Sequence, residues 1–170
     1  MLMTQVALTF SVAGTRMALE ASSVREVVPS VKLVTVPEMP RLLRGFVAID
    51  QEMVPVIRLE QILDPGASSP PMRLQDRIVI IELEGQALGW LADADMETLH
   101  FRTRDTVALP AGHVLNRCAT HVVSVNPPIV LLNPQLLLLE AERARLQQLR
   151  QRLQERLADV GAAEAPMPGL

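Results

Sequence analysis

The sequence predicts a mainly β protein that ends in one long helix, and three observations lead to this class. Short apolar segments, several with clean two-residue alternation, recur about every ten residues between residues 5 and 132. Turns rich in glycine, proline or charged residues separate them, a pattern typical of sandwiches or small barrels rather than an α/β sheet. Residues 135–160, in contrast, contain neither glycine nor proline, which favours a continuous helix.

The first half of the chain predicts a series of short strands. Residues 5–12 alternate between apolar and polar side chains, as expected for a half-buried strand. Ser22 can cap a helical turn because its hydroxyl accepts a free backbone N–H. The expected elements are strands at 5–12 and 16–20, a helical turn at 23–26, extended residues 27–28, a strand at 31–36, a short helix at 40–43, strands at 45–49 and 53–58, and a helical turn at 59–63.

The hairpin at residues 45–58 is the first candidate recognition element. Two apolar strands flank the polar turn Asp50, Gln51 and Glu52, which is a hairpin pattern. Pro55 lies inside the second strand and cannot donate to a ladder, so this strand is expected at a sheet edge or at a bulge. A charged loop on a rigid sheet is a common site of binding.

The second half predicts another set of strands after a connector. Residues 64–76 are rich in proline, glycine and serine, which predicts a linker. The expected division is a first lobe at 4–63, the linker at 64–76 and a second lobe at 77–133. The expected strands of the second lobe lie at 77–83, 87–92, 96–101, 106–109, 120–125 and 129–132.

The C-terminal helix is predicted at residues 134–160. Asn133 is a good N-cap, Pro134 a good first residue and Gly161 a good stop, and the tail at 161–170 is expected to be disordered. The apolar stripe of this helix contains Leu139, Leu146, Leu149, Leu153, Leu157 and Val160. Three roles stay open for this stripe: docking on the chain's own lobes, pairing through Leu146, Leu149, Leu153 and Leu157 with a partner helix or a second copy, or an arginine-rich contact with nucleic acid.

Composition argues against several classes of protein. The net charge of −3 disfavours a general nucleic-acid binder or a binder of anionic membranes. Cys118 is the single cysteine, so no intramolecular disulfide can form and a reducing cytoplasm is expected. No apolar run approaches the roughly 20 residues of a membrane span, and the first residues show no signal-peptide pattern. We expect a cytoplasmic protein without membrane insertion.

Residues capable of catalysis do not form a recognisable constellation. The histidines His100, His113 and His121 lack metal-ligand spacing, and Cys118 shows no thiol-protease pattern. Asp93 and Asp95 would share a strand face, but two carboxylates alone indicate an acidic strand end. We therefore predict no enzyme activity, no metal and no cofactor. A hydrolase or metal enzyme using Asp93 or His121 is the rival from another class.

Six segments stand out in order along the chain: 8–14 (LTFSVAG), 24–28 (VREVV), 44–47 (RGFV), 54–59 (VPVIRL), 77–81 (RIVII) and 89–93 (GWLAD). Together they resemble the CheW family, the coupling proteins of bacterial chemosensory arrays. The resemblance covers residues 4–139 and implies two small, intertwined SH3-like five-stranded β-barrels. It also implies a non-catalytic adaptor that joins chemoreceptor signalling tips to the regulatory domain of a CheA-type histidine kinase.

The same resemblance implies the site residues. The groove between the barrels would take the receptor, and the outer face of one lobe would take the kinase. The implied partner-binding positions are Val24, Glu26, Val27, Gly45, Phe46, Asp50, Val54, Pro55 and Asp93. Among them, Gly45, Val54 and Pro55 match the family's hairpin motif, which shapes the first barrel.

The hairpin tip departs from the family pattern. Family members usually have Asn-Leu-Arg-Gly where this chain has Ala48, Ile49, Asp50 and Gln51. An acidic tip in place of a basic one would change partner choice, because opposed like charges at an interface cost several kcal/mol. We expect a divergent coupling protein. The alternative is a scaffold that uses its C-terminal helix for self-association or for an unrelated helical partner.

Overall fold

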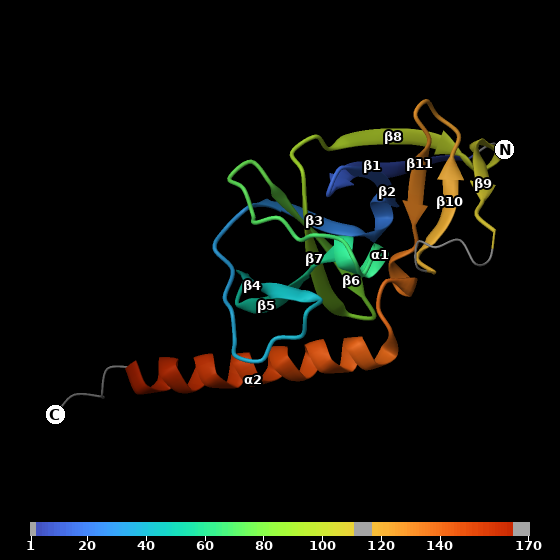
Figure 1. The fold of residues 1–170 in the computed structure, drawn as a ribbon. Coiled ribbons are helices and arrows are strands. Elements are labelled where there is room, and N and C mark those ends of the chain that lie inside the picture. The colour runs from blue at the N-terminus through green and yellow to red at the C-terminus, as the bar shows by residue number, and fades with distance from the viewer. Residues whose placement is uncertain (1–2, 111–116, 165–170) are drawn as a thin grey trace.

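The computed structural model describes residues 3–110 and 117–164, and in these ranges the chain forms two sheets and one long helix (Figure 1). The strands are β1 Thr4–Val12, β2 Thr15–Glu20, β3 Val24–Pro29, β4 Leu43–Ile49, β5 Glu52–Ile57, β6 Arg77–Leu83, β7 Gln86–Ala92, β8 Glu97–Arg102, β9 Thr106–Ala108, β10 Ala119–Val123 and β11 Ile129–Leu132. The helices are α1 Leu59–Leu63 and α2 Glu140–Glu164, with 3-10 turns at Ala21–Ser23, Thr103–Asp105 and Pro134–Leu136. The mainly β prediction is confirmed.

The two sheets draw strands from both halves of the chain. One sheet has the order β8-β1-β2-β11-β10-β9, and the other has the order β3-β6-β7-β5-β4. The expected split into a lobe at 4–63 and a lobe at 77–133 does not describe these sheets. β1 and β2 pair in the sheet of β8 to β11, whereas β3 to β5 join β6 and β7. Periodicity locates a strand but does not reveal which distant strand it pairs with, and so the interleaving was not predictable from local patterns.

Parallel pairings join the chain's distant segments. β11 pairs in parallel with β2, with Val130 opposite Met17. β5 pairs in parallel with β7, and this short ladder contains Val56 opposite Gly89 and Ile57 opposite Trp90. The other ladders are antiparallel. These two parallel contacts hold each sheet together across the long connections.

Three local predictions in the first half are wrong. Residues 31–36 form no regular strand; Val34 makes only an isolated bridge to Phe46. Residues 40–43 form a turn rather than a helix, in which the Leu43 N–H donates to the Pro40 carbonyl at 2.9 Å. The helical turn lies at Ala21–Ser23 instead of 23–26, because Val24 already pairs with Ile81 of β6. At Val24, a long-range pairing thus overrides the local preference for a helical turn.

The long helix begins and ends later than predicted. The Asn133 side chain caps a 3-10 turn by accepting from the Gln135 N–H at 3.0 Å, and the buried Leu137 and Leu138 then turn the chain into the core. α2 starts at Glu140, where the Glu142 carboxylate accepts from the Leu139 N–H at 2.8 Å. Gly161 does not stop the helix, which continues to Glu164. Residues 165–170 of the expected disordered tail lie outside the described residues.

The core joins the two sheets to α2. Phe10 and Trp90 are fully buried, and their ring centroids lie 5.7 Å apart. The same cluster contains Leu146, Leu149 and Leu153 of α2. Smaller clusters lie within each sheet's own strands. The described chain contains no helix long and apolar enough to cross a membrane.

Candidate protein-interaction surfaces

The β4–β5 hairpin tip is a two-residue turn that contains no glycine. Ile49 pairs with Glu52 across the hairpin, and both intervening residues have positive φ, 46° at Asp50 and 67° at Gln51. These values are those of a type I′ turn, whose twist suits a hairpin. Asp50 is exposed at the tip. The acidic residue that the sequence indicated at this position therefore has its carboxylate in solvent.

An ion-pair network connects this hairpin to β3 and to α2. A Glu52 carboxylate oxygen lies 3.1 Å from Arg25 Nη1 of β3, and the other oxygen lies 3.6 Å from Arg150 Nη1 of α2. Arg25 also lies 3.8 Å from Glu26. The hydrogen bond with Glu52 raises the pKa of Arg25. Sequence reasoning found Glu26 but missed Arg25 and Arg150, since only the fold brings these three elements together.

The predicted site residues divide into surface and interior positions. Glu26, Asp50 and Asp93 are partly or fully exposed, Val27 is 39% exposed, and Val24 is half-buried against the core. The other four positions, Gly45, Phe46, Val54 and Pro55, are buried. These four shape the hairpin instead of presenting side chains to a partner in this conformation.

Pro55 lies at the point where β5 and β7 diverge. β5 is an inner strand of its sheet, so the expected edge position is wrong for the strand as a whole. However, the β5–β7 ladder begins only at Val56. The irregularity in the pairing of β4 with β5 lies in β4, between Leu43 and Gly45, and not at Pro55. Because proline has no N–H to donate, Pro55 fits the place where pairing with β7 is absent.

A groove lies between the two sheets, beside the β1–β2 turn. Two adjoining cavities of about 280 and 230 Å³ share Val12, Ala13 and Glu60 among their lining residues. Asp93 lines the larger cavity. Its carboxylate lies 3.0 Å from Arg73 Nη2, while Asp95 pairs with Arg16 at 3.0 Å. The two carboxylates therefore follow β7 and pair with different arginines, which corrects the expected shared strand face.

A buried ion pair fixes the floor of this groove. Arg44 of β4 and Glu60 of α1 are 12% and 7% exposed, and Arg44 Nη2 lies 3.0 Å from Glu60 Oε1. Ser69 of the linker donates to the same oxygen at 2.5 Å, and Arg44 Nη1 donates to the Pro70 carbonyl at 2.9 Å. Burial lowers the pKa of Arg44, although Glu60 opposes this effect. The segment predicted as a linker is thus anchored to the body.

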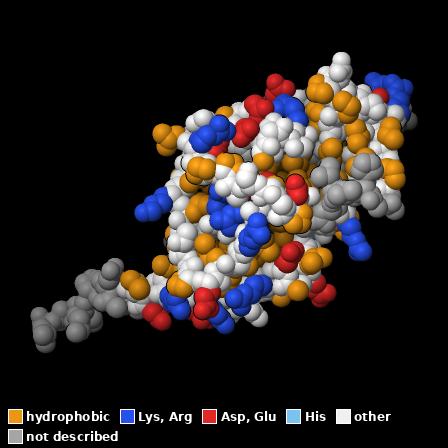
Figure 2. All heavy atoms as spheres, in the orientation of Figure 1, with side chains coloured by type: hydrophobic (Ala, Val, Ile, Leu, Met, Phe, Trp, Pro, Cys, Tyr) orange, Lys and Arg blue, Asp and Glu red, His pale blue; other side chains and the backbone are white. Residues whose placement is uncertain are grey.

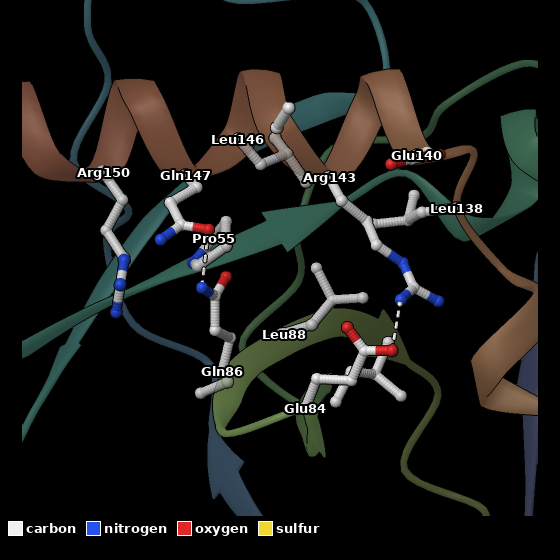
Figure 3. A pocket seen from close by; sticks show the side chains of 13 residues that line it. Pro55, Glu84, Gln86, Leu88, Leu138, Glu140, Arg143, Leu146, Gln147 and Arg150 are labelled. Carbon is white, nitrogen blue, oxygen red and sulfur yellow. Dashed lines mark hydrogen bonds and ion pairs between the residues drawn. The ribbon is translucent and has the colours of Figure 1, made fainter.

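α2 lies against the five-stranded sheet and encloses a cleft of about 550 Å³ with the β6–β7 turn (Figure 3). Two polar contacts cross this cleft. Gln86 Nε2 donates to Gln147 Oε1 at 2.6 Å, and Arg143 Nη1 lies 3.5 Å from Glu84 Oε1. Pro55 lies in the apolar lining below the helix. Charged side chains of both signs follow α2 on the visible face (Figure 2).

The middle of the apolar stripe of α2 packs inside the molecule, whereas Leu139 and Val160 at its two ends are exposed. Leu146, Leu149 and Leu153 are buried in the main core, whereas Leu157 is 47% exposed. Of the three roles left open by the sequence, docking on the chain's own sheets describes this structure. Leu146, Leu149 and Leu153 are therefore not available as a surface for self-association while α2 is docked.

The described residues offer no arrangement for metal or thiol chemistry. Within them, no group of three His, Cys, Asp or Glu side chains is placed to hold a metal ion. Cys118 is buried, and burial raises the pKa of its thiol to about 11, so the reactive thiolate is scarce near neutral pH. His113 lies outside the described residues.

Comparisons with known proteins agree with this architecture. The CheW-like domain family matches residues 6–142. Among solved structures, the chain is similar to the scaffolding protein TtCheW from Thermoanaerobacter tengcongensis, with a TM-score of 0.71 and 23% sequence identity. That alignment covers 79% of this chain and 88% of that chain, and at this identity it shows a shared fold. A comparison with curated proteins found no significant match.

The family match begins within β1, includes the strands from β2 to β11 and ends at the start of α2. Most of α2 is therefore an extension beyond the matched region. The chain belongs to the CheW-like domain family, a family of adaptor and scaffolding proteins in chemotaxis signal transduction.

Proposed function

We propose that this protein is a cytoplasmic adaptor that couples chemoreceptor signalling tips to the regulatory domain of a CheA-type histidine kinase. Family membership over residues 6–142 carries the proposal. The molecule also offers two separate surfaces, the groove between the sheets and the exposed side of β3 with the β4–β5 tip. An adaptor needs two such surfaces so that both partners can bind at once.

In this proposal the receptor helices occupy the groove, and the kinase contacts the five-stranded sheet. Asp93 belongs to the groove, while Val24, Glu26, Val27 and Asp50 belong to the kinase-facing surface. The five-stranded sheet would close into an SH3-like barrel. Two contacts support this closure. Val34, in the segment between β3 and β4, bridges to Phe46 of β4 with N–H···O distances of 2.8 Å, and Arg25 of the edge strand β3 pairs with Glu52 of β5.

Binding measurements with both partners test this function. The full-length protein is titrated separately with a kinase regulatory domain and with a receptor tip fragment from the same organism. We expect micromolar or tighter binding to each, and a tenfold or larger change in kinase affinity for Asp50→Arg, because reversing a charge at the tip changes the electrostatic match. Glu20→Arg, at the end of β2 in the other sheet, makes the same charge change and is expected to have little effect.

Two outcomes would contradict the proposal. Binding to only one partner would remove the coupling role and leave a single-partner scaffold. Equal changes in kinase affinity for Asp50→Arg and Glu20→Arg would show that the hairpin tip is not part of the kinase contact. Self-association through Leu146, Leu149, Leu153 and Leu157 does not fit this conformation, because the first three of these leucines are buried.

A further inference from the structure

The arginines of α2 form two rows with different surroundings. Arg143 and Arg150 face the body and pair with Glu84 and Glu52. The second row consists of Arg145, Arg152 and Arg156, which are all exposed. With 3.6 residues per turn these three lie within about 40° of one another, along about 16 Å of helix. The buried leucines run between the two rows.

No contact within the described part of the molecule accounts for the second row of arginines. Among the described residues, none of its three arginines forms an ion pair, whereas both arginines of the first row do. Arg152 and Arg156 are also four residues apart, and like charges at this spacing destabilise a helix. A local rule broken without a compensating contact is expected at functional positions.

A small apolar notch adjoins this row. It has a volume of about 120 Å³ and lies between α2 and the segment that joins β3 to β4. Its lining residues are Val36, Pro37, Glu38, Leu149, Arg152, Leu153 and Arg156. This volume suits one apolar side chain. Glu38 is the single carboxylate of the lining, so the two arginines leave the notch with a positive charge.

We propose that the row Arg145, Arg152 and Arg156, with the adjoining notch, is a docking site for an acidic amphipathic helix of a partner protein. Carboxylates repeating at four- and seven-residue spacing on such a helix would match the arginines, and guanidinium–carboxylate pairs are strong charge-assisted contacts. An apolar side chain beside them would enter the notch. Leu157 and Val160, exposed at the same end of α2, extend the apolar contact.

Charge favours a protein over a polyanion as the occupant. Glu155 and Asp159 lie beside the arginine row, and the whole chain carries a net charge of −3. Nucleic acid and anionic membranes require a larger basic excess. The three arginines lie beyond residue 142, where the family match ends, whereas Val36, Pro37 and Glu38 of the notch lie within the matched region. Neither the arginines nor these three residues belong to the proposed receptor and kinase surfaces.

A designed peptide tests the site in the full-length protein. The probe is a three-heptad helical peptide with glutamates at four- and seven-residue spacing beside a leucine stripe; a second peptide has lysine at each glutamate position. Fluorescence anisotropy in 50 mM salt is expected to show binding of the acidic peptide only. Arg152→Glu with Arg156→Glu is expected to weaken this binding at least tenfold.

Matched variants separate the site from general charge and from folding. Lys32→Glu with Arg104→Glu makes the same change in net charge at exposed positions outside the notch and is expected to bind like the native protein. Arg152→Gln with Arg156→Gln removes charge without reversal and should weaken binding less than the glutamate pair. Far-ultraviolet circular dichroism should remain native in all variants, and binding to the kinase and receptor fragments should be unchanged.

Several results would overturn the proposal. Equal binding by the two charge-reversed variants would show that only net charge matters. Tighter binding of duplex DNA or phosphatidylglycerol vesicles than of the acidic peptide would assign the row to a polyanion. Self-association of the native protein that is lost in the Arg152→Glu, Arg156→Glu variant would assign it to a second copy. If the acidic peptide did not bind the native protein, the proposed docking site would be contradicted.

Discussion

Gly45 lies in β4 where the preceding segment crosses close to the strand. A Cβ atom at this position would lie 2.9 Å from Leu33 Cβ and 2.9 Å from the Val34 carbonyl oxygen. The glycine therefore allows Val34 to bridge to Phe46, a contact that covers β4, an edge strand of the sheet. The family motif pointed to this glycine, but only the structure shows that close packing explains it.

We expect Gly45→Ala to destabilise the protein by about 1–3 kcal/mol, because the new methyl group would force the Val34 backbone and the Leu33 Cβ atom to move away. Urea unfolding followed by tryptophan fluorescence measures this, since Trp90 is buried. Gly66→Ala is the control: its Cβ would have a nearest neighbour at 3.5 Å. We expect it to be neutral or slightly stabilising. Equal unfolding midpoints for the two variants would contradict the close-packing explanation.

At the scale of elements, α2 shows how a stripe acquires its role. Leucines at mixed three- and four-residue spacing predict an apolar helix face, but the pattern is equally compatible with a partner helix. The packing of α2 on the rest of the molecule decides the outcome, because Leu146, Leu149 and Leu153 are buried while Leu139 before them and Leu157 and Val160 after them are exposed. Similarly, Gly161 is a good helix stop locally, yet the helix continues through it.

We expect Leu149→Ala to cost about 2–4 kcal/mol of stability, since it removes a buried side chain and leaves a cavity. Leu157→Ala, on the same stripe but half-exposed, should stay within about 0.5 kcal/mol of the native protein. Thermal and urea unfolding of both variants measure the contrast. If Leu157→Ala proved as costly as Leu149→Ala, the extent of the docked interface would have to be revised.

At the scale of the whole molecule, the Arg44–Glu60 pair ties three regions together. It joins β4, α1 and the linker, and it lies beside the groove between the sheets. Such a contact cannot be found from spacing, because Arg44 and Glu60 lie on separate elements and Ser69 lies in a segment that resembles a flexible connector.

We expect Glu60→Gln to destabilise the protein by about 3 kcal/mol, since it leaves the Arg44 cation buried without its counter-charge. Glu97→Gln breaks the pair with Arg16, in which Glu97 is 77% exposed, and should cost less than about 1 kcal/mol. Urea unfolding near neutral pH compares the two. A similar loss in both variants would show that burial does not strengthen the dependence on Glu60.

The sequence by itself determined the mainly β class, most strand positions, the long terminal helix and the family, because side-chain periodicity and turn residues act over a few neighbours. It also identified Glu26 and Asp50 as surface candidates. Only the tertiary structure decided how the sheets interleave, which helix face is buried, and which arginines are paired. These features depend on contacts between residues far apart in the chain, and a local pattern carries no information about which distant side chain arrives beside it.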